Sequence, residues 1–321
     1  MTWLDKAQPF LIPLSIGVGV ALAQIPWVAE LAPSAIVPLL ALMLYATFLP
    51  LPLKNFAQNL QKPKVVLASL ATNFIWTPIF AWLLGAVFLR DAPDLGVGLI
   101  MLMVTPCTDW YIVFTGVAGG DVVLATALLP INLILQVLLL PMYLLIFAGT
   151  LVDINPNQLF ETVFLVLLIP LLIAVISRNF LLWKKGQIWI EKIASKIAAI
   201  QVLSLNLAII SIFASEGNAL LQHPRLLLKI LVPVCLFFLV NFIAAYRVGR
   251  YLQFSYEEFA CFSCTTLARN SPLSLAIAAS AFPHRPLIAL TLVIGPLIEL
   301  PIMVLASQFL LKIRRRGYWQ T

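Results

Sequence analysis

Two hydrophobic stretches, each interrupted by a proline, decide the fold of this chain. Residues 101–110 read MLMVTPCTDW, and residues 265–274 read TTLARNSPLS. A hydroxyl residue stands directly before each proline, Thr105 in the first stretch and Ser271 in the second. Ser and Thr are good N-caps and Pro is a good first helical residue, so one half-helix should end before each proline and another should begin there. Paired interruptions in corresponding halves of a chain are typical of secondary transporters.

The composition indicates that these stretches lie in a lipid bilayer. The chain has 321 residues, of which 62% are hydrophobic and 10% are charged, and its mean hydropathy is +1.03. A chain of this kind is an all-α polytopic membrane protein. Nucleic acid is not an expected partner, despite the net charge of +7, because the basic residues follow the loops between the apolar segments. A Walker motif, a dinucleotide fingerprint and a catalytic triad are all absent from the sequence, so neither an enzyme nor a cofactor is expected.

Ten transmembrane helices are predicted from segments of spanning length. They cover residues 10–26, 34–52, 65–89, 95–117, 122–148, 159–182, 197–215, 226–249, 257–281 and 286–312. With both termini in the cytoplasm, the inner segments hold most of the basic residues: Lys6, Lys54, Lys62, Lys64, Arg178, Lys184, Lys185, Lys192, Lys196, Arg247, Arg250, Lys312, Arg314, Arg315 and Arg316. The outer segments hold Arg90, Arg225, Lys229 and Arg285. This asymmetry satisfies the positive-inside rule and favours ten spans with both termini in the cytoplasm. The protein is expected in the plasma (inner) membrane.

The ten spans divide into two five-helix repeats, residues 1–155 and 156–321. Because five is odd, two such repeats in tandem must have opposite orientations. The second helix pair supports the repeat, since residues 129–136 (LPINLILQ) correspond to residues 294–299 (IGPLIE), each with a proline followed by a polar residue. The long basic connection at 177–196 is expected to be a loop within the second repeat. A simple proline kink remains an alternative for either interruption taken alone.

Few strongly ionisable residues lie deep inside the predicted spans, and the candidates are Asp109, Arg269 and Glu299. A charge at the bilayer centre costs about 3 kcal/mol or more, so it is usually paired and functional. If the interrupted helices cross, Arg269 approaches Asp109, and Glu299 or Asp109 is left as a carboxyl that can carry a proton. A structural salt bridge between Arg269 and Asp109, or a protonated Glu299 bonded to a neighbouring helix, is the alternative.

Cys107 is the candidate for soft-ligand chemistry. It follows Pro106, where the second half-helix is expected to begin, and a helix N-terminus favours thiolate. Thiolate binds thiophilic metals and metalloids, although a small residue packing at a helix crossing is the commoner role of such a cysteine. Asn73, Asn132 and Gln136 are secondary candidates for the same cavity, with helix–helix hydrogen bonding as an equal alternative. A metal site is not expected, because Cys261 and Cys264 lack further ligands nearby.

Three motifs resemble those of the bile acid/arsenite/riboflavin transporter superfamily, and most closely its arsenite efflux permease branch. They are TPCT at 105–108, ARNSPLSLAIA at 268–278 and IGPLIELP at 294–301. The resemblance covers nearly the whole chain. It implies a panel domain from spans 1, 2, 6 and 7 and a core domain from spans 3–5 and 8–10, with spans 4 and 9 broken and crossing.

The resemblance also implies roles for individual residues. In arsenite permeases a cysteine after the fourth-span proline and a glutamate in the tenth span are required, and Cys107 and Glu299 match them. Thr105, Asn270 and Ser271 belong to the same motifs and are further candidates for substrate binding, as are Asp109 and Arg269. The chain departs from arsenite permeases at Asp109 and Trp110. It departs from the sodium-coupled branch at Thr265 and Arg269, which argues against conventional sodium sites.

These observations predict proton-coupled efflux of arsenite, antimonite or a similar small oxo-species by alternating access. The expected partners are a small inorganic or organic solute, H⁺ as coupling ion with Na⁺ as the alternative, and the lipid bilayer. Sodium- or proton-coupled uptake of an organic anion is the second hypothesis. A membrane sensor or scaffold that does not transport is the third.

Overall fold

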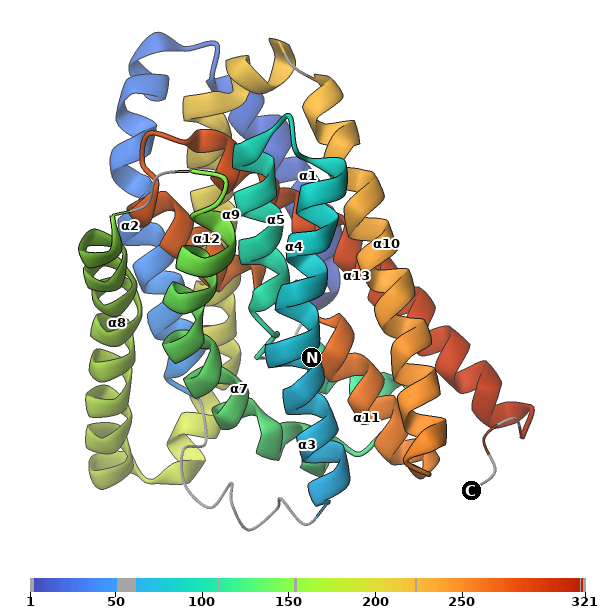
Figure 1. Ribbon diagram of the computed structural model, residues 1–321. Helices are drawn as coiled ribbons and strands as arrows, with labels where there is room; N and C mark the ends of the chain where they lie inside the picture. Colours follow the sequence, from blue (N-terminus) through green and yellow to red (C-terminus); the bar gives the residue numbers. More distant parts are fainter. Residues whose placement is uncertain are drawn as a thin grey trace. The chain divides into compact units, whose positions relative to one another are not determined.

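The described part of the chain is mostly helical. The computed structural model describes residues 3–50, 62–108, 110–152, 155–222, 224–317 and 319. Within these ranges every regular element is a helix, and the extended pairing consists of one isolated bridge (Figure 1). Seven of the described helices are long and apolar enough to cross a membrane, and three shorter apolar helices cover Phe10–Leu22, Pro93–Val104 and Ser271–Ala281. The chain is therefore an integral membrane protein, while the ten-span inverted repeat stays a prediction.

Two compact units divide the chain between them. The first comprises Met1–Pro52, Ile154–Leu227 and Pro272–Val293, and the second comprises Leu53–Asp153, Leu228–Ser271 and Ile294–Thr321. The first unit contains α1 (Trp3–Leu22), α2 (Pro26–Phe48), α8 (Pro156–Lys185), α9 (Gln187–Gln222) and most of α12 (Ser271–Ala281). The second contains α3 (Pro63–Ala71), η2 (Thr72–Trp76), α4 (Thr77–Phe88), α5 (Pro93–Val104), α6 (Trp110–Val117), α7 (Val122–Tyr143), η3 (Leu144–Ala148), most of α10 (Pro224–Tyr251), α11 (Tyr256–Leu267) and the longer part of α13 (Pro286–Arg315).

In the first unit, α9 packs against both α1 and α2, and α8 packs against α2. Gly19 allows α1 to approach α9 closely, because a Cβ at that position would lie 2.6 Å from the Cβ of Phe213 and 2.7 Å from the carbonyl oxygen of Ile210. The Ser15 hydroxyl donates a hydrogen bond of 2.8 Å to Oδ1 of Asn206 across the same interface. The polar residue in the middle of α9 is thus satisfied by helix packing.

The basic connection between α8 and α9 is shorter than the sequence predicted. The expected loop at 177–196 is wrong, because α8 continues to Lys185 and α9 begins at Gln187. Gly186 alone separates them, with a φ of +76°. Glycine is the usual residue at such a left-handed helix end, and the flanking Lys, Trp and Glu residues are compatible with a helix.

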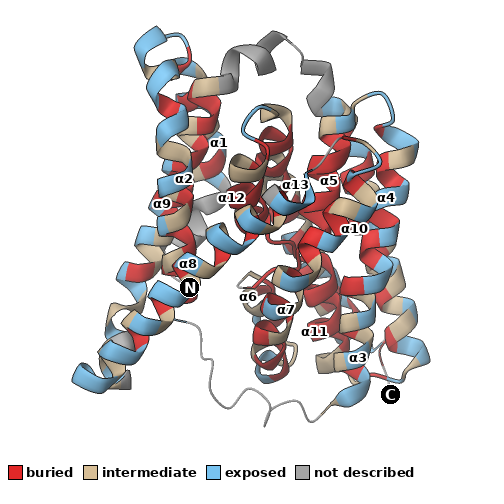
Figure 2. Ribbon diagram, turned by 60° about the vertical axis from the view of Figure 1, so that its left-hand side comes forward, coloured by how far each residue is buried: buried red, intermediate tan, exposed pale blue. Residues whose placement is uncertain are grey.

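The second unit contains the two π-helical turns and a deeply buried helix, α5. Every residue of α5 from Leu95 to Val104 is buried, as the red ribbon in Figure 2 shows. The turn η2 joins α3 to α4, and the hydroxyl of Tyr143 donates a 2.6 Å hydrogen bond to the carbonyl oxygen of Phe74 within it. π-Helical turns are rare and often occur at functional sites, because they shift side chains out of the ordinary helical register.

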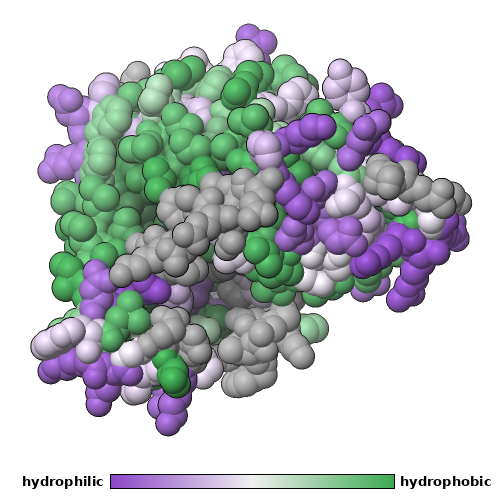
Figure 3. Space-filling model, turned by 90° about the horizontal axis from the view of Figure 1, so that it is seen from below, coloured by the Kyte–Doolittle hydropathy of each residue, from purple (hydrophilic) through white to green (hydrophobic). Residues whose placement is uncertain are grey.

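Charged residues stabilise the end of the second unit at which α3, α7 and α11 begin. The Lys62 ammonium lies 3.1 Å from Asp121 and 3.2 Å from Glu258. Asp121 also caps α7 by accepting from the backbone N–H of Leu124 at 2.9 Å. Figure 3 views the molecule from this end, where hydrophilic side chains are visible beside apolar ones. The N-termini of α7 and α11 therefore each carry an acidic side chain, and Lys62 at the start of α3 binds both.

Candidate functional site

The two proline-containing interruptions lie against each other in the second unit. The first separates α5 from α6, and the second separates α11 from α12. Pro106 and Arg269 form the isolated antiparallel bridge. The N–H of Cys107 donates to the carbonyl oxygen of Ala268 at 3.0 Å, and the N–H of Asn270 donates to that of Thr105 at 2.7 Å. Each interruption thus supplies hydrogen bonds that the other lacks, which is how irregular backbone is tolerated at membrane depth.

Cys107 lies in this extended crossing and not on the first turn of a helix. The sequence predicted that a half-helix begins at Pro106, but Thr105 has extended dihedral angles and α6 begins at Trp110. The physical reason is the bridge, because residues that pair with the opposite interruption cannot also wind into a helix. The side chain of Cys107 is 2% exposed. The helix-dipole argument for its thiolate therefore does not apply, because α6 begins three residues later.

The guanidinium group of Arg269 binds the carboxyl ends of both α5 and α11. Its Nη1 donates to the carbonyl oxygen of Met103 at 2.9 Å, in the last turn of α5. Its Nε donates to the carbonyl oxygen of Leu267 at 3.3 Å, and Nη2 donates to that of Thr266, both at the end of α11. Each helix C-terminus carries about half a negative charge, so one fixed cation balances two convergent ends.

Two further side chains position this guanidinium. Nη2 of Arg269 donates to Oδ1 of Asn73 at 3.1 Å, and Asn73 lies in the π-helical turn η2. The ring of Phe237 on α10 lies under the group, with 5.2 Å between its centroid and Cζ of Arg269. Arg269 is 2% exposed, so these contacts replace water almost completely. Phe237 and the main-chain carbonyls that accept from Arg269 were not predicted, because no sequence motif identifies them as partners of this side chain.

Glu299 approaches the crossing from α13. Its Oε1 accepts a hydrogen bond of 2.8 Å from the backbone N–H of Arg269, and the residue is 4% exposed. Gly295, one turn earlier, makes this approach possible, because a Cβ there would lie 2.6 Å from Cδ1 of Leu102 and 2.8 Å from Oγ of Ser271. The glycine of the IGPLIE motif therefore brings the carboxyl to the crossing.

The three secondary candidates lie in the same unit as the crossing and are all fully buried. Nδ2 of Asn73 donates to the carbonyl oxygen of Thr265 at 3.3 Å, and Nδ2 of Asn132 donates to the hydroxyl of Thr265 at 3.4 Å. Gln136 follows Asn132 by one turn of α7, and neither its Oε1 nor its Nε2 has a hydrogen-bond partner among the described residues. Such buried, unsatisfied amide atoms cost about 1–3 kcal/mol and indicate a site for water or a polar ligand.

The remaining predicted site residues are placed as follows. The amide of Asn270 donates to the hydroxyl of Thr108 at 3.2 Å, and the hydroxyl of Thr105 donates to the carbonyl oxygen of Met101 at 3.0 Å. Oγ of Ser271 is buried without a hydrogen-bond partner among the described residues. Asp109 lies outside the described residues, so its pairing with Arg269 stays a prediction.

A buried crossing of two interrupted helices, with one cation and one carboxyl at membrane depth, is the kind of site that secondary transporters use. The family model described as Sodium Bile acid symporter family matches residues 37–223, which is more than half of the chain. The chain therefore belongs to the sodium bile acid symporter family of membrane transporters.

Known relatives include proteins of arsenical resistance. The chain is 27% identical to the arsenical-resistance protein Acr3 of Corynebacterium glutamicum over 248 residues, which cover 74% of this chain and 67% of the relative. It is 24% identical to Acr3 of Alkaliphilus metalliredigens over 278 residues, covering 83% and 78%. It is also 25% identical to an uncharacterized transporter of Synechocystis over 347 residues, covering 98% and 89%.

Proposed function

We propose that this protein exports arsenite, antimonite or a similar small oxo-species in exchange for protons. One observation carries the proposal, namely that Cys107 and Glu299 bind consecutive residues of the same crossing. The backbone of Cys107 bonds to Ala268, and the carboxyl of Glu299 bonds to Arg269. A soft sulfur and a proton-carrying carboxyl are thus linked through one short extended segment. The similarity to two arsenical-resistance proteins supports the same substrate class.

Glu299 is the coupling group of this proposal, with Asp109 as the second candidate. As a carboxylate, Glu299 accepts the N–H of Arg269 in a charge-assisted bond, which is stronger than the bond to a neutral acid. Protonation of Glu299 therefore weakens the contact that holds α13 to the crossing. A change of this kind can favour one access state over the other, which is what coupling requires. In this proposal the panel (spans 1, 2, 6 and 7) and the core (spans 3–5 and 8–10) move against each other in alternating access, with the termini in the cytoplasm.

Arg269 has a supporting role in this mechanism. Its donors bind main-chain carbonyls and Asn73, so the cation stabilises the crossing on which Cys107 and Asn270 lie. The unsatisfied amide of Gln136 and the hydroxyl of Ser271 supply polar groups for a hydroxylated solute. A metalloid hydroxide offers both a soft centre for Cys107 and O–H groups for such side chains.

Solute flux into proteoliposomes tests the proposal. An acidic interior should drive arsenite accumulation without sodium, because an antiporter moves protons out as the solute moves in. A sodium gradient alone should drive none. Accumulation of an organic anion in place of arsenite, driven by sodium or by an alkaline interior, would instead establish the symporter hypothesis. Absence of flux for every solute under every gradient would favour a protein that does not transport.

A further inference from the structure

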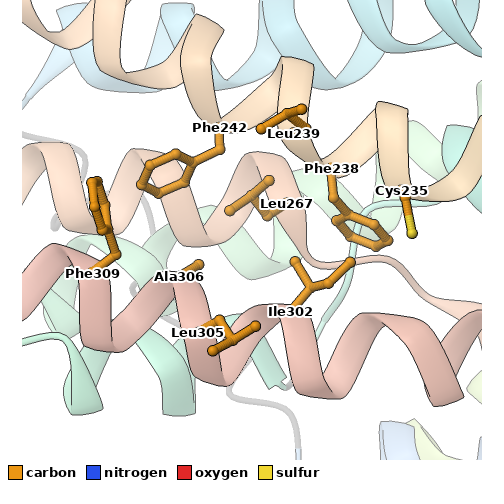
Figure 4. A pocket seen from close by; sticks show the side chains of 9 residues that line it. All are labelled: Cys235, Phe238, Leu239, Phe242, Leu267, Ile302, Leu305, Ala306 and Phe309. Atoms are coloured by element: carbon orange, nitrogen blue, oxygen red, sulfur yellow. The ribbon is translucent and has the colours of Figure 1, made fainter.

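An apolar pocket lies between α10 and α13 in the second unit, outside the crossing. It has a volume of about 470 Å³ and is lined by Cys235, Phe238, Leu239, Phe242, Leu267, Ile302, Leu305, Ala306 and Phe309 (Figure 4). Pockets that hold small ligands typically measure about 300–1,000 Å³. Every lining side chain is apolar or a thiol, so the pocket fits a hydrocarbon and offers no polar group to a hydrophilic solute.

The pocket is open at the surface of the second unit, and its apolar rim is exposed there. Leu239 is 57% exposed and Leu305 is 68% exposed, whereas Leu267 at the inner wall is fully buried. The rings of Phe242 and Phe309 close one end, with their centroids 5.6 Å apart in an edge-to-face arrangement. Figure 4 shows Cys235 and Ile302 at the other end. A linear chain can therefore enter from the bilayer and lie along the two helices.

Basic residues follow the aromatic pair at the end of α13, and a further aromatic residue follows it on α10. On α13, Lys312 follows Phe309 by three residues, which places it near the same face, and Arg316 comes directly after the helix ends at Arg315. Both are exposed, and neither forms an ion pair with another described residue. On α10, Tyr246 follows Phe242 by one turn. An aromatic and basic band beside an apolar pocket is the arrangement that binds a lipid with an anionic head group.

We propose that this pocket binds one acyl chain of an anionic membrane phospholipid, with the head group held by Lys312 and Arg316. The charge of these side chains selects the anionic head group, because a zwitterionic lipid gains little from two unpaired cations. The site has a direct connection to the crossing. Leu267 forms its inner wall, and the carbonyl oxygen of the same residue accepts from Arg269. A bound chain therefore packs against the residue at which α11 ends.

The cysteines of the protein provide a native reporter. Cys235 is exposed in the pocket, whereas Cys107, Cys261 and Cys264 are buried. The experiment measures the rate at which a maleimide labels Cys235 in the delipidated full-length protein in a neutral detergent, with increasing phosphatidylglycerol or phosphatidylcholine. Labelling should slow with both lipids, and the half-effective concentration should be about tenfold or more lower for phosphatidylglycerol. A Cys235→Ser protein identifies any background labelling.

Three variants make the outcome decisive. Lys312→Gln with Arg316→Gln should raise the half-effective concentration of phosphatidylglycerol by about fivefold per residue, toward the value for phosphatidylcholine. Lys184→Gln with Lys185→Gln, the same change at the end of α8, should leave it unaltered. Ala306→Trp should slow labelling without lipid by filling the pocket, and added lipid should then have no further effect. The proposal would be overturned if the two lipids had equal half-effective concentrations in the unaltered protein, or if neither lipid slowed the labelling of Cys235.

Discussion

Replacing Arg269 by alanine tests the physical account of the crossing. The side chain donates to three main-chain carbonyls, at Met103, Leu267 and Thr266, and the residue is 2% exposed. A buried acceptor that loses its donor costs about 1–3 kcal/mol, so three of them cost about 3 kcal/mol at least. Against a total stability of about 5–15 kcal/mol this is a large loss. At about 2 °C per kcal/mol, the melting temperature should fall by about 6 °C or more.

The assay is thermal unfolding of the purified protein in detergent, with three comparisons. Arg314→Ala is the matched control, because Arg314 is half exposed and its ion pair with Glu257 should contribute only about 0–1 kcal/mol. Arg269→Lys should be intermediate, since it keeps the charge but not the planar fork. Millimolar guanidinium should partly restore the melting temperature of Arg269→Ala, because the ion can bind where the side chain is missing. It should not raise the melting temperature of the other variants. The reasoning would be refuted if Arg269→Ala lowered the melting temperature no more than Arg314→Ala does and guanidinium had no effect on it.

Three other predictions follow from the same structure. Cys107→Ser should abolish metalloid resistance in cells at equal protein level, because oxygen is a poor replacement for a soft sulfur ligand; full resistance would remove the thiol from the mechanism. A double-mutant cycle of Arg269→Ala with Asp109→Ala should give less than additive losses of melting temperature if the two side chains interact, and additive losses would show that they do not. Burial raises the pKa of Asp121, but the N–H of Leu124 and the Lys62 ammonium outweigh it and hold this pKa below its ordinary value. The stability that these two contacts contribute is therefore present above the unfolded pKa of about 3.9 and is lost as the pH falls through the folded pKa. In Asp121→Asn, the melting temperature should therefore fall less steeply as the pH is lowered.

The interruptions could be predicted from sequence because proline and its preceding hydroxyl act locally. Thr105 with Pro106 and Ser271 with Pro272 mark where regular hydrogen bonding must stop, whatever the surroundings. The ionisable and polar residues beside both prolines can also be read directly from the sequence. The family resemblance is confirmed by the match over residues 37–223, which includes the first interruption at Thr105 and Pro106.

The geometry of the crossing could not be predicted, because it depends on tertiary pairing. The bridge between Pro106 and Arg269 keeps Cys107 extended, whereas local propensity favours a helix there. The π-helical turn that contains Asn73 has no sequence signature, yet Asn73 is a partner of Arg269. The sequence predicted a role in substrate binding for Arg269, whereas its guanidinium donates to main-chain carbonyls and to Asn73. Helix propensity describes each helix in isolation, whereas these contacts join residues of several helices.

The central claim is that Glu299 couples proton movement to solute movement. Proteoliposomes that contain Glu299→Gln test it directly, because glutamine keeps the shape and the acceptor for the N–H of Arg269 but cannot change its charge. Arsenite exchange at equal pH on both sides should be retained, whereas accumulation driven by an acidic interior should be lost. Both are measured in the same preparation, with the unaltered protein alongside. A Glu299→Gln protein that still concentrates arsenite on a pH gradient alone would contradict the account.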